Sequence, residues 1–149
     1  MNREILFRGK VIESYLHRSD GKWVFGSLVL NGNEARIFEQ NNNTWLVDPE
    51  TVGQFTDLRD KNGKWIFEKD IVKADFEIYQ ILAKAPARKH EYKGVICEVI
   101  YKNGSFLIGN PYGPTAFEVK ELSSVFRDNI EVIGNTPDNY ELLKGGKNA

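Results

Sequence analysis

The chain has 149 residues, of which 41% are hydrophobic and 28% charged, and its formal net charge is −1. This is the size of one ordinary domain, with enough apolar residues for a packed core, and it excludes wholesale disorder. The small net charge argues against a global electrostatic footprint for nucleic acid, although it does not exclude a local basic patch. Only one cysteine occurs, Cys97, so an internal disulfide and a cysteine-based metal site are excluded. No apolar run has the length of a membrane span, and we expect a soluble, intracellular protein.

Short alternations of apolar and polar residues, separated by turn residues, run through the first half of the chain and are typical of β-strands. The predicted strands are residues 4–10, 22–30, 35–38, 44–47, 52–56 and 65–67. Asn31-Gly32 favours a hairpin over residues 22–39. Gly26, in the middle of a strand, indicates a bulge or a close crossing of two backbones. A turn is expected at Asp48-Pro49, and residues 57–64 are expected to form a solvated polar turn.

The segment after Val72 has a different pattern. Phe76, Tyr79 and Leu82 recur at a spacing of three without an internal glycine or proline, which predicts a helix over residues 76–84. A proline ends this helix, and residues 87–93 are expected to form a basic connection.

Strands return in the last third of the chain, where they are predicted over residues 94–101, 105–108 and 130–133. Asn103-Gly104 predicts a hairpin, and Pro137 suits the first turn of a terminal helix over residues 138–143. We therefore predict a mainly β fold, a small, strongly bent sheet or barrel with short attached helices. We expect a single domain over residues 1–144, followed by a frayed tail at 145–149.

Three parts of the sequence carry a resemblance to a known family. They are REILFRGK with GKWVFGSL, then DPETVGQFTDLRDKNGKWIFEKDIV, then EVIGNTPDNYELL, at residues 3–10, 21–28, 48–72 and 131–143. In this order they resemble the YopX family of bacteriophage and prophage proteins. The resemblance implies a small β-rich protein in the cytoplasm of a bacterial host, with self-association suggested, and it implies no activity. Residues 73–93 lie outside these motifs and are predicted to be an insertion.

Two positions depart from the family pattern. Lys69 stands where the family usually has glycine, so a backbone turn with positive φ would have to be made by a lysine. Pro137 stands where the family usually has an aromatic or aliphatic residue. Both changes affect turns, and neither removes an obvious reactive group.

Four carboxylates, Asp57, Asp60, Glu68 and Asp70, lie close together in the sequence. Their spacing matches no calcium loop and lysines are interleaved, so a solvated turn is favoured over a metal site. Glu68 and Asp70 share one face of a strand. If one is buried, it must accept backbone hydrogen bonds or pair with an arginine such as Arg8, and we predict this structural role for the pair.

The basic stretch before residue 94 is the best candidate for a nucleic-acid contact. Cationic side chains beside an aromatic ring can hold phosphate and stack a base. The residues predicted for this role are Lys84, Arg88, Lys89, Tyr92 and Lys93. The opposing interpretation is that such charges on a loop only increase solubility.

No catalytic or cofactor motif is present, so we expect no enzyme activity, no cofactor and no metal. His17 and His90 lack a third ligand, and Cys97 is expected to be a buried, inert thiol. The leading hypothesis is a non-enzymatic, homo-oligomeric interaction protein that also binds an unidentified phage or host protein. The alternative is a nucleic-acid-binding β-barrel protein, and a hydrolase using Glu68 and Asp70 is the third and weakest.

Overall fold

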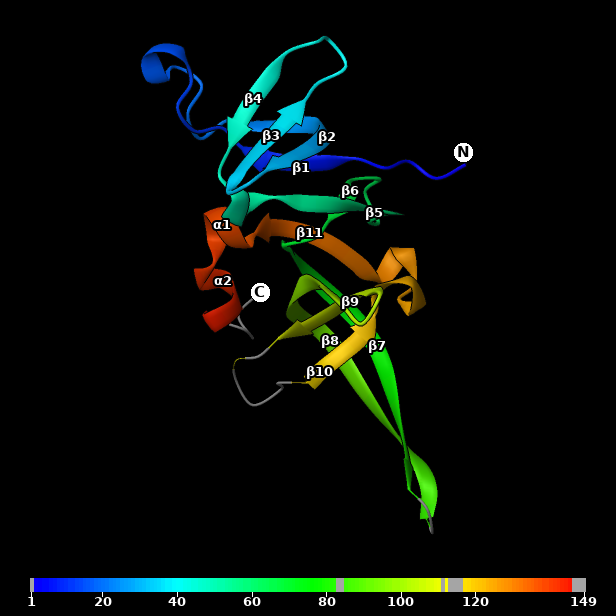
Figure 1. Ribbon diagram of the computed structural model, residues 1–149. Coiled ribbons are helices and arrows are strands. Elements are labelled where there is room, and N and C mark those ends of the chain that lie inside the picture. The colour runs from blue at the N-terminus through cyan, green and yellow to red at the C-terminus, as the bar shows by residue number, and fades with distance from the viewer. Residues whose placement is uncertain (1, 83–84, 111, 113–116, 146–149) are drawn as a thin grey trace. The chain divides into compact units, whose positions relative to one another are not determined.

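The computed structural model describes residues 2–82, 85–110, 112 and 117–145 (Figure 1). It is built mainly of antiparallel strands, with two short helices near the end of the described chain, which confirms the mainly β prediction. The chain divides into two compact units, residues 1–57 and 58–149, and the boundary falls within strand β5. No barrel closes in the described parts of the chain. The single-domain prediction and the predicted insertion at 73–93 stay predictions.

The first unit is an antiparallel sheet. Its strands are β1 (Phe7–Lys10), β2 (Trp23–Asn31), β3 (Glu34–Phe38), β4 (Thr44–Val47) and the first part of β5 (Gly53–Arg59). They lie in the order β4-β3-β2-β1-β5, and the β2–β3 pair confirms the hairpin predicted over residues 22–39. The core is formed by Val11, Val24, Ala35, Ile37 and Val47.

Glycine is required at one position of this sheet. A Cβ atom at Gly26 would collide with the backbone carbonyl of Phe38 on the neighbouring strand, which confirms the predicted close crossing. Two single turns of 3-10 helix connect the strands, η1 (Tyr15–His17) and η2 (Pro49–Thr51). The Asp48 side chain caps η2 by accepting a 3.0 Å hydrogen bond from the Glu50 amide, as expected for the predicted turn.

The second unit contains the other strands and two further 3-10 turns. They are β6 (Trp65–Phe67), β7 (Asp70–Leu82), β8 (Ala85–Lys102), β9 (Ser105–Asn110), β10 (Phe117–Glu121), η3 (Leu122–Ser124), η4 (Arg127–Asn129) and β11 (Ile130–Asn135). The five-stranded sheet has the order β10-β9-β8-β7-β11. Its β8–β9 hairpin confirms the predicted turn at Asn103-Gly104. Buried side chains on one face, including Val72, Cys97, Val99 and Ile108, form the larger core.

The other face of this sheet is covered by the terminal helices α1 (Thr136–Asn139) and α2 (Glu141–Gly145), which confirm the predicted helix with an interruption at Tyr140. Leu143 packs there against Ile71 and Ile96. The side chain of Asn135 caps α1 by accepting a 2.9 Å hydrogen bond from the Asp138 amide. The burial of Leu143 and the cap formed by Asn135 thus stabilise these short helices.

Asp60 corrects the expectation of a solvated turn over residues 57–64, because its side chain is completely buried. One carboxylate oxygen accepts hydrogen bonds from the amides of Asn62 (2.9 Å) and Lys64 (2.8 Å), and the other accepts from Val132 (2.9 Å). The Lys61 amide also donates to the Ile130 carbonyl. The turn therefore covers the edge of β11 that a neighbouring strand would otherwise pair.

The helix predicted over residues 76–84 is wrong, because β7 runs through the described part of that segment as a strand. The connection predicted over residues 87–93 is likewise part of β8. Cross-strand partners decide the conformation: Phe76 lies opposite Tyr92, and Ile78 lies opposite His90. Phe76 and Ile78 fit a period of two and pack on the core side, whereas Tyr79 lies on the opposite face, and pairing with β8 selects the strand.

Candidate interaction surface

Strands β7 and β8 continue beyond the five-stranded sheet as a two-stranded ribbon, which we call the arm (residues 75–82 and 85–94). Strand β11 pairs with β7 only as far as Ala74, and β9 pairs with β8 only from Glu98. Pairing between β7 and β8 continues outward to Leu82 and Ala85. In Figure 1 this green hairpin projects away from the sheet that it continues.

A β-bulge marks the base of the arm. The register between β7 and β8 shifts between Ala74 and Phe76, and Gly94 has a positive φ of 60°. The Gly94 amide donates a 2.6 Å hydrogen bond to the Asp75 carboxylate. Because a bulge bends its strand and increases the local twist, Asp75 and Gly94 set the direction in which the arm leaves the sheet.

The residues predicted for nucleic-acid contact are split between the two faces of the arm. The described ones are Arg88, Lys89, Tyr92 and Lys93, all on β8, whereas Lys84 lies outside the described residues. Arg88 and Tyr92 share a face with His90, because side chains alternate along a strand. Lys89 lies on the other face, opposite Tyr79. The four side chains therefore do not form one continuous basic surface.

Tyr92 belongs to the core rather than to an exposed stacking platform. Its ring stacks on Phe76, with 5.1 Å between the ring centroids, and it packs against the larger core of the second unit. Such packing holds the ring in place at the base of the arm. Because Phe76 and the core cover the Tyr92 ring, its face is not open to solvent in the way that base stacking requires.

Lys89 is held by two carboxylates on its own face of the arm. Its ammonium lies 3.5 Å from Glu77 and 3.0 Å from Glu91. The hydrogen bond from Lys89 lowers the pKa of Glu91, and the same contact raises the pKa of Lys89. Glu77 and Glu91 lie directly opposite each other and would repel, so the lysine between them relieves an unfavourable cross-strand pair.

A groove of about 270 Å³ lies at the base of the arm. Residues from the arm and from the η3–η4 segment line it: Asp75, Phe76, Glu77, Tyr79, Glu91, Lys93, Ser124, Val125, Phe126 and Asn129. Three carboxylates and the ammonium of Lys93 belong to this lining, and two of the carboxylates, Glu77 and Glu91, also contact Lys89. Tyr79 and Phe126 are 62% and 68% exposed. The sequence did not predict this groove, because its two sides lie far apart in the chain and its strand was predicted as a helix.

Of the two carboxylates given a structural role, Asp70 is buried, with 1% of its surface exposed, and Glu68 is partly exposed. Asp70 accepts a 2.7 Å hydrogen bond from the Phe67 amide, which lies across the turn that begins β7. A buried carboxylate bound in this way stabilises the turn.

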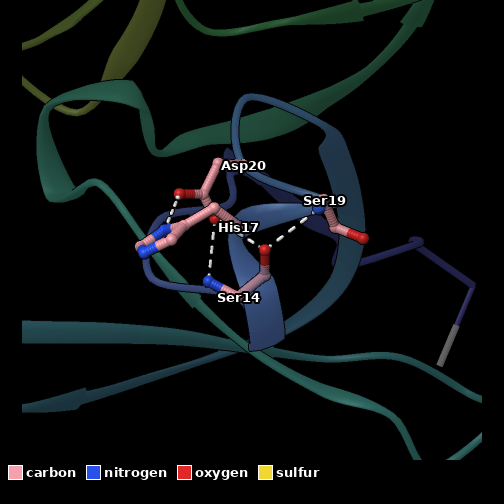
Figure 2. A network of polar contacts seen from close by, with 4 residues as sticks. All are labelled: Ser14, His17, Ser19 and Asp20. Carbon is pink, nitrogen blue, oxygen red and sulfur yellow. Dashed lines mark hydrogen bonds and ion pairs between the residues drawn. The ribbon is translucent and has the colours of Figure 1, made fainter.

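A polar network in the first unit brings together a serine, a histidine and an aspartate (Figure 2). Asp20 accepts hydrogen bonds from the Ser14 hydroxyl (2.6 Å) and amide (2.8 Å), and it contacts His17 Nδ1 at 2.7 Å. The bonds from Ser14 lower the pKa of Asp20 to about 2. In a Ser-His-Asp catalytic triad the serine hydroxyl contacts the histidine, whereas here it donates to the aspartate. The network orders the loop around η1.

Cys97 and the two histidines lie in different parts of the described structure. Burial raises the pKa of the Cys97 thiol to about 12, as expected for an inert cysteine. His17 and His90 belong to different units. Within the described ranges, no group of three or more His, Cys, Asp or Glu side chains is placed to hold a metal ion.

Comparison with known families matches residues 11–144 to the family described as YopX protein. The chain belongs to the YopX family. No curated protein matches the chain.

Parts of the motifs that carry the YopX resemblance form turns and caps in this chain. DPETVG forms the Asp48-capped turn, and the Gly134–Asn135 pair ends β11 and caps α1. Lys69, where the YopX pattern has glycine, has a φ of 74°, so a lysine does adopt the left-handed conformation there. These parts of the motifs therefore correspond to turns and a helix cap of the fold.

Among the residues that the structure describes, no helix is both long and apolar enough to cross a bilayer.

Proposed function

We propose that this chain is a phage- or prophage-encoded accessory protein of the bacterial cytoplasm that acts without catalysing a reaction. It is a homo-oligomeric protein-interaction module that also binds a further phage or host protein, and the arm is its contact element. One observation carries this proposal: the arm is a long ribbon that continues outward after both flanking strands have ended.

The physical reason is that a two-stranded hairpin has little burial of its own and is only marginally stable in water. A protein surface laid against the arm would supply the missing burial. Tyr79 is well placed for such a contact, because it is largely exposed and tyrosine is enriched at protein interfaces. Lys89 and its two carboxylates neutralise much of the charge around Tyr79, which lowers the cost of covering this face.

Removal of the arm tests the proposal. Phe76 and Tyr92 lie opposite each other, so an Asn-Gly turn can join them in place of residues 77–91. We expect the full chain to have an oligomeric mass by light scattering, and the shortened chain to be a monomer that keeps its β-sheet circular dichroism. Equal masses for the two folded proteins would contradict the proposal.

A second candidate is the nucleic-acid-binding module that uses Lys84, Arg88, Lys89, Tyr92 and Lys93. The observation in its favour is that Arg88 and His90 share one face of the ribbon, and a two-stranded ribbon fits the major groove of DNA. Fluorescence polarisation with labelled DNA and RNA separates the candidates. Binding that weakens with salt and with Arg88→Glu supports this function, and no binding at low salt removes it.

A further inference from the structure

One edge of β7 changes its surroundings at the base of the arm. Strand β8 flanks β7 along its whole length, whereas β11 flanks the opposite edge only as far as Ala74, which pairs with Ile130. From Asp75 outward, no strand in the described part of the chain continues along that edge. The basal groove lies at this point, with residues 75–79 on one side and residues 124–129 on the other. An extended segment there would continue the line of β11.

The groove has the chemistry of a cation-binding surface. Among the side chains that line it, the carboxylates of Asp75, Glu77 and Glu91 outnumber the ammonium of Lys93. Lys89, beside the groove, shares its single ammonium between Glu77 and Glu91, so the group as a whole keeps an excess of negative charge. The rings of Tyr79 and Phe126, both largely exposed, lie among these charges. Carboxylates beside exposed aromatic faces are the combination that binds an arginine or lysine side chain, through charge-assisted hydrogen bonds and cation–π contact.

We infer that this groove binds an extended, basic peptide segment of a partner protein. The segment adds a strand to the edge of β7 beyond Ala74 and places an arginine or lysine side chain among the carboxylates. Main-chain hydrogen bonds provide affinity in this mode, and alternate side chains provide specificity. The inference rests on the proposed interaction role and names the chemistry of the partner.

Charge argues against two other occupants. Phosphate groups of nucleic acid would be repelled by the three carboxylates. A second copy that presented the same edge would bring its own Asp75 and Glu77 toward those of the first, which is unfavourable for like charges. A basic segment is complementary to the groove in both respects.

Selection from a displayed library of short random peptides tests the inference with the full chain as bait. We expect enriched peptides to alternate arginine or lysine with β-branched or aromatic residues. In fluorescence anisotropy, Glu77→Lys should weaken binding of a selected peptide by roughly tenfold or more, because a charge-assisted contact becomes repulsive. Glu34→Lys is the matched control, since Glu34 is an exposed carboxylate of the first unit, and it should leave the affinity unchanged.

A second probe tests strand addition separately from charge. N-methylation of alternate amides removes the hydrogen-bond donors of one peptide edge and leaves its charges intact. We expect such a peptide to lose binding, and amide exchange of residues 75–79 to slow only with the unmodified peptide. Equal binding by both peptides, enrichment of acidic peptides, or no enrichment at all would overturn the inference.

These outcomes are distinguishable from those of arm removal. If deletion of residues 77–91 dissociates the oligomer but no basic peptide is enriched, the interaction role stands and the inference fails. If the full chain binds basic peptides in the groove, but both the full and the shortened chain are monomers, the inference stands and homo-oligomerisation fails.

Discussion

Strands β7 and β8 pair with each other both in their inner halves, within the five-stranded sheet, and in their outer halves, which form the arm. The two halves differ in what surrounds them. Val72 and Cys97 lie opposite each other in the inner half and are completely buried between other strands and the η3 segment. Tyr79 and Lys89 lie opposite each other in the outer half and are both exposed to solvent. Strand pairing therefore sets the geometry along the whole ribbon, whereas burial, and with it most of the stabilisation, extends outward only as far as the base of the arm, where Phe76 and Tyr92 pack against the core.

This difference separates the stabilising part of the ribbon from the part that is available for contacts. Hydrogen bonds in the outer half are solvent-exposed and few apolar contacts support them, which are the features of a segment that opens locally at low cost. A partner that covers the arm would stabilise the outer half without altering the core.

The largest effect is expected from paired truncations in one strand. Ile71→Ala removes a fully buried side chain and should lower the free energy of unfolding by about 3 kcal/mol. Tyr79→Ala, on the outer half, should lower it by less than about 0.5 kcal/mol. Urea denaturation of both variants measures the two values. Similar losses would show that the outer half is as strongly packed as the inner half.

Asp70→Ala should have the next largest effect. It leaves the buried Phe67 amide without its acceptor and should destabilise the protein by about 1–3 kcal/mol. Glu77→Ala is the matched carboxylate on the same strand, and it should cost no more than about 0.5 kcal/mol because its ion pair is exposed. Thermal and urea unfolding give both numbers. If the Asp70 variant unfolds like wild type but loses a biochemical activity, Asp70 is a functional residue.

The parts of the fold that the sequence predicted correctly are those specified by local turn chemistry. Asn31-Gly32, Asn103-Gly104, Asp48-Pro49 and Pro137 each mark a hairpin, a cap or a helix start that the structure contains. These residues restrict the backbone by themselves, so their effect is visible without knowledge of the tertiary neighbours.

The parts that were predicted wrongly depend on partners distant in the chain. Residues 76–82 are a strand because β8 pairs with them, and Asp60 is buried because the Val132 amide, 72 residues away, donates to it. The groove needs both the arm and the η3–η4 segment. The alternation of apolar and polar residues along a short segment does not reveal contacts with residues far away in the chain. A charged residue in a turn is therefore expected to be exposed until its buried partner is known.

Lys69→Gly tests the backbone conformation of the turn that begins β7. Because Lys69 has positive φ, glycine should relieve the strain of its Cβ atom and stabilise the fold by about 0.5–1 kcal/mol after the extra entropy of the unfolded chain. Lys69→Ala removes the ammonium but keeps the Cβ atom, and serves as the control. Urea denaturation should rank the glycine variant above both wild type and the alanine variant. An alanine variant as stable as the glycine variant would assign the effect to charge.

The smallest effect is expected from Lys89→Gln, which tests the electrostatics of the outer half alone. The hydrogen bond from Lys89 is the main cause of the lowered pKa of Glu91, and Lys93 contributes least among its named causes. An NMR titration of the Glu91 carboxyl carbon should therefore move to higher pH in Lys89→Gln, and much less in Lys93→Gln. A lowered carboxyl pKa in the folded state stabilises the fold above the ordinary glutamate pKa, and this stabilisation is lost as the pH falls through the lowered value. Because these groups are exposed to solvent, this contribution is small, and the unfolding midpoint in urea at neutral pH should change little in both variants. A clear loss of stability in Lys89→Gln would show that the ion cluster supports the arm as burial supports the inner half.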